Sequence, residues 1–376
     1  MSLIFVFGAG ASYGEQLRPL TKDPATQPTN NANPPLTVGF FSRSLYDSIG
    51  YTGKQAEADF KEAFEYIRWA FALSEPVGEG RWASLNVEDV FTGIELDREF
   101  RSSESDAGGR LIVIRNKLVR YLWRIIADCT QYKYGEYYRR VKSFIDDRID
   151  VSILNFNWDL LLDQEFMVQA GLGWEIRVGP YQNFSNMVLE EPGVRTGHIG
   201  EFSMFLKMHG SLDWFQCTNP ICPNASKMEI MNNTQDCLYR AQGIDVEGVM
   251  TCERCGTDMN PLLIPPLLRK PVNENWIIRA VWGHARQRLQ QASKAVIVGF
   301  SAPPTDFYAA WLFRSTLGIK TKEELEVFVV NPQNEPGHEQ HKDFSTRMAT
   351  IFPHGYNSEF LAFSQIESIL ERLTEV

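Results

Sequence analysis

The sequence predicts an α/β fold in which a parallel sheet carries helices on both faces and is interrupted by a helical insertion and a small cysteine-bearing module. Three observations predict it. Short apolar runs rich in β-branched and aromatic residues recur along the 376 residues, as expected of strands that are buried on both faces of a sheet. Long stretches with helical spacing separate these runs. Four of the six cysteines form two close pairs.

Five apolar runs are expected to form the strands of the sheet. They are Leu3–Phe7, Val151–Leu154, Phe205–Met208, Ala295–Val298 and Glu326–Val330. A Gly, Asn, Ser or His stands at the end of each run. Ligands of open α/β sheets bind at the carboxyl ends of the strands. The sequence therefore predicts one shared binding edge in a Rossmann-like domain that comprises residues 1–40, 149–216 and 272–376.

Residues 41–148 are expected to form the helical insertion. Apolar residues recur at helical spacing in 58–73, 111–129 and 137–145. This is more helix than one crossover between two strands requires, so the segment is interpreted as a lid or an oligomer surface. A terminal helix is expected at 357–373.

Composition and charge exclude several classes of partner. The chain has 37 Lys and Arg against 47 Asp and Glu, a formal net charge of −10. No basic tract is present, so nucleic acid and anionic membranes are not expected as direct partners. No apolar run reaches the length of a membrane span. The first residues carry no basic group ahead of a short apolar run, which is unlike a signal peptide, so a cytoplasmic protein is expected.

The turn Gly8-Ala9-Gly10-Ala11-Ser12 directly follows the first expected strand. Gly8 and Gly10 have no side chain and therefore allow a diphosphate to approach the backbone, and the start of the next helix supplies N–H donors. The alternative interpretation is a tight turn between strand and helix with no ligand.

Two cysteine pairs predict a structural zinc site in a module that spans residues 217–271. Cys217 and Cys222 are separated by four residues, and Cys252 and Cys255 by two. Four thiolates suit a closed tetrahedral site without a catalytic water. Cys237 lies between the pairs and is either an alternative ligand or a bystander. The alternative for all of them is reduced, buried cysteine.

Three polar residues at strand ends are candidates for catalysis. Asn157 and Asp159 follow the second expected strand, and His209 closes the third. A neutral imidazole serves as a base near pH 7, and an amide orients a hydroxyl group or a water molecule. Taken singly, Asn157 and Asp159 also suit helix caps or turns.

The order of these motifs along the chain resembles the sirtuin family of NAD-consuming enzymes. GAGAS is followed by NFNWD, by HGSLDWFQC with a second cysteine five positions later, by the C-x2-C pair, and by GFS and VVN. The segment from His209 to Pro261 is the most specific part of the match. The helical insertion is not part of the sirtuin core.

The resemblance implies a role for each of the catalytic candidates. Asn157 matches the asparagine that orients ribose or water at the scissile bond. Asp159 matches the aspartate that contacts the nicotinamide carboxamide, and His209 matches the histidine that acts as a base on ribose.

The resemblance also implies a set of binding residues and a metal. The residues that match the NAD-binding positions are Gly8, Ala9, Gly10, Ser12, Gly299, Ser301 and Asn331. The residues that match the structural zinc ligands are Cys217, Cys222, Cys252 and Cys255. The implied cofactors are NAD⁺, as a substrate, and Zn²⁺.

The chain departs from the protein deacylases of the family in the half that binds acyl-lysine. Gly14 is followed by Glu-Gln-Leu-Arg instead of Ile-Pro-Asp-Phe-Arg, and 263–269 replaces a stretch that helps form the peptide groove. We therefore expect hydrolysis of NAD⁺ to nicotinamide and ADP-ribose, with a role in antiphage defence by analogy alone. The alternatives are an NAD-dependent protein deacylase and a sensor that binds NAD or ADP-ribose without turnover. A second copy of the chain or an activating protein is the expected partner.

Overall fold

The computed structural model describes residues 2–19, 33–101, 105–130, 133–146, 148, 150–165, 167–170, 173–176, 204–219, 221–225, 228–230, 250–265 and 275–374. The chain forms two compact units. The first comprises Met1–Arg18, Tyr134–Gly210 and Pro271–Val376, and the second comprises Pro19–Lys133 and Ser211–Lys270. None of the helices in the described ranges combines the length and the apolar character that crossing a bilayer requires.

A five-stranded sheet forms the centre of the first unit. Its strands are β1 (Leu3–Phe7), β4 (Val151–Asn155), β7 (Phe205–Lys207), β11 (Lys294–Val298) and β12 (Glu326–Val330). They lie in the order β12-β11-β1-β4-β7, and each neighbouring pair is parallel. Counted along the chain, the order from β7 to β12 is the doubly wound order 3-2-1-4-5. The predicted parallel sheet is therefore confirmed.

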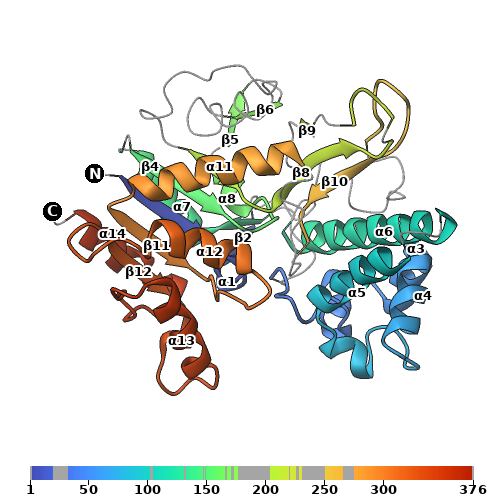
Figure 1. Cartoon of the computed structure of the whole chain (residues 1–376), viewed down its shortest axis with the longest axis horizontal. Helices are drawn as coiled ribbons and strands as arrows, with labels where there is room; N and C mark the ends of the chain where they lie inside the picture. The colour runs from blue at the N-terminus through green and yellow to red at the C-terminus, as the bar shows by residue number, and fades with distance from the viewer. Residues whose placement is uncertain are drawn as a thin grey trace. The chain divides into compact units, whose positions relative to one another are not determined.

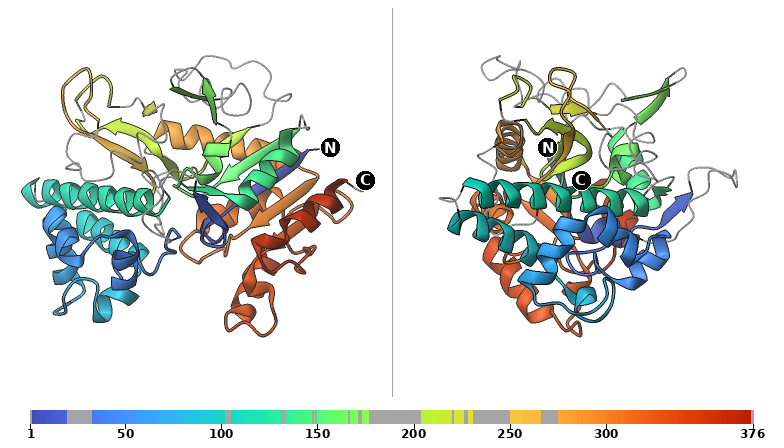
Figure 2. Two further views of the ribbon diagram at one scale, coloured as in Figure 1. Left: turned by 180° about the vertical axis from the view of Figure 1, so that it is seen from behind. Right: turned by 90° about the vertical axis from the view of Figure 1, so that its right-hand side faces the viewer.

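Helices cover both faces of this sheet. On one face, Phe5, Phe7 and Ile153 share a buried cluster with residues of α7 (Glu136–Asp146) and α14 (Ile366–Thr374). Figure 1 shows α11 (Trp276–Gln291) and α12 (Phe307–Thr316) in front of the strands, and the view from behind in Figure 2 shows the red α14 on the opposite side. The smaller elements of this unit are α1 (Ala9–Tyr13), α8 (Leu161–Glu165), β5 (Met167–Ala170), β6 (Gly173–Ile176), η3 (Pro332–Asn334), α13 (His341–Ile351) and η4 (Phe363–Gln365).

The terminal helix is shorter than the sequence predicts. It begins at Ile366 instead of residue 357. Asn357 pairs with the outer strand of the sheet instead: its N–H donates to the Val327 carbonyl at 2.8 Å, and its carbonyl accepts from Val329 at 2.9 Å. Backbone pairing with an otherwise open sheet edge satisfies these groups and so replaces the first turns of the expected helix.

The second unit contains helices and a three-stranded sheet. The helices are α2 (Arg43–Ile49), α3 (Gly53–Asp59), α4 (Lys61–Ala70), η2 (Gly80–Ser84), α5 (Val87–Phe100) and α6 (Ser105–Thr130). The strands of the sheet are β8 (Gly210–Cys217), β9 (Met228–Ile230) and β10 (Met259–Leu263), in the order β10-β8-β9. Two short strands, β2 (Leu17–Pro19) and β3 (Lys133–Gly135), complete the described elements.

Aromatic packing supports the helices of the second unit. The Phe41 ring stacks on Tyr121 at 5.4 Å, and Phe64 stacks on Trp82 at 5.6 Å. Such ring pairs add to the free energy of burial. The helical character expected for 58–73 and 111–129 is confirmed by α3, α4 and α6. The proposed three-part division of the chain stays a prediction, and the structure groups the helices and the cysteine-bearing segments in one compact unit.

Candidate functional site

The strand order points to the carboxyl ends of β1 and β11 as the place where a ligand binds. These two strands are neighbours in the sheet, and the direction in which successive strands are added reverses between them. Open α/β sheets bind ligands at this switch point. The turns that begin at Gly8 and Gly299, both singled out from the sequence, follow these two strands.

The two turns pack backbone against backbone. The Gly10 N–H donates to the Gly299 carbonyl at 3.0 Å. Gly299 has a φ of +64°, and a Cβ atom there would lie 2.0 Å from the backbone nitrogen of Ala11. A Cβ at Gly8 or Gly10 would also meet the Gly299 turn within 3 Å. These contacts explain the three glycines without a ligand, so the diphosphate role expected for Gly8, Ala9 and Gly10 stays a prediction.

The remaining residues of the second turn and the end of β12 lie against each other. The Asn331 side chain donates to the Phe300 carbonyl at 3.3 Å and accepts from the Gln333 N–H at 3.0 Å. The Ser301 carbonyl accepts from Arg347 at 3.3 Å. Asn331 therefore fixes the turn that carries Gly299 and Ser301, and the nucleotide contacts expected for these residues stay predictions.

Asn157 joins two distant parts of the chain through a buried hydrogen-bond network. Its Nδ2 donates to the Ser12 hydroxyl at 2.9 Å and to the Tyr138 hydroxyl at 3.3 Å. The Ser12 and Tyr138 hydroxyls lie 2.9 Å apart. Burial raises the pKa of Tyr138 well above its ordinary value, so its hydroxyl keeps its proton. The Asn157 Oδ1 is buried and has no hydrogen-bond partner among the described residues. An unpaired buried acceptor is costly, which makes this atom suited to a ligand hydroxyl or a water molecule.

The buried ammonium group of Lys207 contacts the backbone of Asp159. The Lys207 Nζ donates to the Asp159 carbonyl at 2.6 Å and to the Asp163 Oδ2 at 3.1 Å. The side chains of Lys207 and Asp163 are both 0% exposed. Burial raises the pKa of Asp159, while the Lys207 cation and a hydrogen bond with Ser12 oppose that increase. Lys207 thus fixes the turn that carries both Asn157 and Asp159.

His209 packs against the two residues that flank Asn157. The Phe156 ring meets the imidazole edge-on with centroids 5.0 Å apart, and the Trp158 Nε1 donates to the His209 carbonyl at 3.1 Å. His209 Nε2 lies 3.7 Å from the Asp306 Oδ2. The following residue, Gly210, has a φ of +80°, a conformation that favours glycine. His209 thus packs against the residues on either side of Asn157, at the ends of β4 and β7.

The structure adds three residues that the sequence did not single out: Tyr138, Lys207 and Asp306. Each acts through a partner far away in the chain, for example Tyr138 with Ser12, which is 126 positions distant. A lysine inside an apolar strand is the one local signal among them, because a buried lysine requires a partner. In the sequence, Tyr138 looks like an ordinary helix residue and Asp306 like a helix cap.

Glu15 is expected to make stability depend on pH. Its carboxyl accepts N–H groups from Tyr137 and Tyr138 at 2.8 and 3.1 Å, and burial raises its pKa from 4.5 to about 8. Between these values the unfolded chain loses the Glu15 proton and the folded chain keeps it. The free energy of unfolding should therefore fall as the pH rises from 4.5 to 8, by at most ~5 kcal/mol.

The Glu15→Gln variant should flatten this pH dependence when urea unfolding is followed across the same range. Exposed Glu371 offers a matched control, because Glu371→Gln should keep the slope of the native protein. A native protein whose stability does not change between pH 4.5 and 8 would contradict the assignment.

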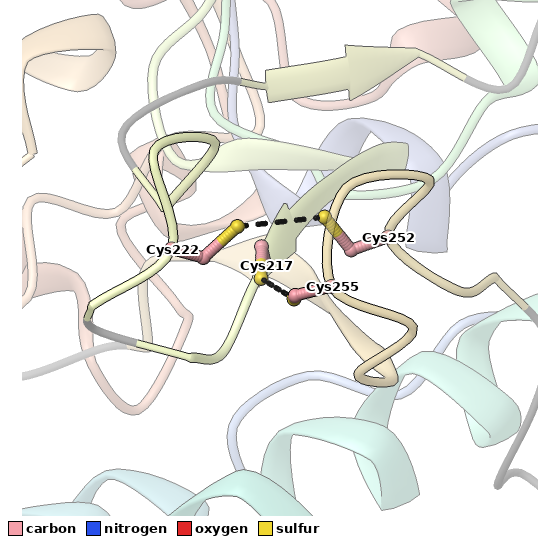
Figure 3. Close-up of side chains that lie close together, drawn as sticks. All are labelled: Cys217, Cys222, Cys252 and Cys255. Carbon is pink, nitrogen blue, oxygen red and sulfur yellow. Dashed lines mark hydrogen bonds between the residues drawn. The ribbon is translucent and has the colours of Figure 1, made fainter.

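Four cysteine thiols form a compact cluster in the second unit. Cys217 ends β8, Cys222 follows it, and Cys252 and Cys255 lie in the segment before β10 (Figure 3). All four sulfurs lie within 4.8 Å of one another, with Cys217 to Cys255 at 3.5 Å and Cys222 to Cys252 at 3.8 Å. Four bonds of ~2.3 Å to a tetrahedral zinc ion place the sulfurs ~3.8 Å apart. The donor set and its dimensions therefore fit Zn²⁺. Cys237 lies outside the described residues.

Comparison with known proteins returns Sir2 structures. No protein-family model and no curated protein match the chain. A mutant of a Sir2 homologue in complex with 2′-O-acetyl ADP-ribose matches 99% of this chain and 91% of its own, with 12% identity and a TM-score of 0.43. A Sir2 mutant with a p53 peptide and NAD matches 100% and 92%, with 10% identity and a TM-score of 0.39. A Sir2 homologue in complex with NAD matches 68% and 71%, with 13% identity and a TM-score of 0.37.

Proposed function

We propose that this chain consumes NAD⁺ and hydrolyses it to nicotinamide and ADP-ribose. The observation that carries the proposal is the arrangement at the ends of β4 and β7. There, the buried Asn157 Oδ1 has no hydrogen-bond partner among the described residues, and His209 packs against Phe156, the residue before Asn157. The doubly wound strand order supports a nucleotide as the ligand.

The reaction depends on orienting the nucleophile at ribose and on stabilising positive charge more than on a strong acid or base. The nicotinamide ring of NAD⁺ is already a cationic leaving group, and breaking its bond to ribose produces an oxocarbenium ion. Asn157 Oδ1 is suited to accept a hydrogen bond from the attacking water or from a ribose hydroxyl, and so to hold it at the anomeric carbon. His209 is suited to take up the proton that the nucleophile loses. Water then adds its oxygen to ribose, and nicotinamide and a proton are released.

Asp159 is assigned to the nicotinamide carboxamide. Asp159 is 3% exposed, its Oδ1 accepts the Leu161 N–H at 3.1 Å, and its carboxyl also accepts a hydrogen bond from Ser12. A carboxyl group held in this way keeps one oxygen directed at a fixed position, which suits recognition of a carboxamide N–H. A carboxamide rotated out of the plane of its ring loses conjugation with it, which weakens the bond to ribose.

Water is proposed as the nucleophile because of the departures from the deacylases. The sequence lacks the stretch that helps form the peptide groove in that group, at 263–269, and it also departs from that group at 14–18. A protein deacylase would transfer the acyl group to ADP-ribose and would need a peptide for every turnover. Depletion of NAD⁺ in antiphage defence is the biological role that the resemblance favours for a hydrolase.

The purified chain should release nicotinamide from NAD⁺ without any peptide. Asn157→Ala and His209→Ala should each lower the rate at least ~100-fold, the usual contribution of a general base or an orienting group, while circular dichroism shows that both variants are folded at the assay temperature. His354 is exposed, so His354→Ala serves as the matched control and should keep the full rate. Equal rates in the native protein and in both site variants would contradict the proposal.

A further inference from the structure

A carboxylate faces the candidate base in the first unit. Asp306 Oδ2 lies 3.7 Å from His209 Nε2, and the two side chains are 9% and 10% exposed. The other carboxylate oxygen of Asp306 has a separate role: Oδ1 accepts the Ala309 N–H at 3.1 Å and so caps the first turn of α12. The capping contact fixes the carboxylate, because rotation that improved one contact would break the other.

Aromatic rings enclose this pair. The His209 imidazole lies at 25° to the Trp282 ring with centroids 6.3 Å apart, and Phe156 meets it edge-on. Trp282 is itself fixed, because its Nε1 donates to the Met208 carbonyl at 2.8 Å. Apolar walls exclude water and strengthen the attraction between a carboxylate and an imidazolium ion.

Three elements contribute described contacts to the imidazole. The segment after β4 contributes Phe156, α11 contributes Trp282, and α12 contributes Asp306. Tyr308, also on α12, packs edge-on against Trp282 at 6.3 Å. Among these described contacts, Asp306 contributes the carboxylate that lies close to His209.

We propose that Asp306 is a positioning residue for His209. It holds the ring orientation, stabilises the protonated imidazole, and favours the neutral form that carries its proton on Nε2 and its lone pair on Nδ1. Asp306 thereby sets the pH at which His209 gains or loses a proton. The consequence for turnover rests on the proposed NAD⁺ hydrolysis, whereas the effect on the His209 pKa does not.

The test uses substitutions that remove the negative charge of Asp306 and keep the side-chain cap of α12. Asparagine and serine cap helices about as well as aspartate, so Asp306→Asn and Asp306→Ser should both fold. In an NMR titration of the histidine ring nitrogens, both variants should lower the His209 pKa by about one unit, a tenfold loss of proton affinity. Asp343 is exposed on α13, so Asp343→Asn has the same change in charge and should leave the His209 titration unchanged.

Turnover provides the second measurement. The acid limb of the pH profile of kcat should move to lower pH by the same amount as the His209 pKa, with little change in KM. A folded Asp306→Asn variant in which His209 titrates as in the native protein would overturn the proposal. A shifted titration in a protein that releases no nicotinamide would support the pair and would count against NAD⁺ hydrolysis, so the two failures are distinguishable.

Discussion

The Cys252→Ser variant is expected to lose tightly bound zinc and to be less stable by ~5 kcal/mol or more. The native protein, purified without a chelator, should hold one zinc ion per chain by elemental analysis. Binding of zinc to a structural site contributes on the order of 10 kcal/mol to the free energy of folding. Removal of one of the four thiolates leaves the tetrahedral site incomplete. Because Cys217 ends the central strand β8 of the three-stranded sheet, loss of the metal should unfold that sheet.

Cys129 offers the matched control for this variant. It is buried in α6 and lies outside the group of four thiols. Cys129→Ala should therefore keep one zinc per chain, whatever its small effect on packing. A native protein that holds no zinc, and whose unfolding does not respond to a chelator, would contradict the assignment of the cluster as a metal site.

The Gly299→Ala variant is expected to destabilise the first unit by ~3 kcal/mol or more. The new methyl group would lie 2.0 Å from the Ala11 nitrogen and 2.4 Å from the Gly10 carbonyl carbon, and these are backbone atoms that cannot move aside alone. The φ of +64° adds strain for any residue with a Cβ. Relief of the clash requires the two turns at the ends of β1 and β11 to separate, which also disturbs the candidate site.

A second glycine provides a control, because its substitution by alanine should raise the stability instead of lowering it. Gly283 lies inside α11, and a Cβ there would meet no other atom within 4 Å. Gly283→Ala should therefore stabilise the protein by up to ~1 kcal/mol, the helix propensity that alanine gains over glycine. Urea unfolding of both variants measures the contrast. A Gly299→Ala protein as stable as the native chain would contradict the close packing of the turns.

Local patterns predicted the parts of the fold that depend on local chemistry. The five strands follow from short apolar runs, and the cysteine cluster follows from the spacing of two pairs. The expected terminal helix was wrong over 357–365, because backbone pairing of Asn357 with β12 depends on a sheet that the segment itself does not encode.

Long-range pairing explains what the sequence left out of the candidate site. Asn157 was identified as a strand-end residue, but its bond to Tyr138 depends on how α7 packs on the sheet. Asp306 precedes a helix and so looks like a cap, which it is. Its position opposite His209, 97 residues earlier, depends on the fold of the whole first unit.

The products formed from NAD⁺ test the central claim most directly. Native protein is incubated with NAD⁺, with and without an acetyl-lysine peptide, and nicotinamide, ADP-ribose and acetylated ADP-ribose are quantified by liquid chromatography with mass detection. We expect equal amounts of nicotinamide and ADP-ribose at a rate that the peptide does not change. Nicotinamide that appears only with the peptide, alongside acetylated ADP-ribose, would contradict the account, and so would complete recovery of unaltered NAD⁺ from protein that binds it.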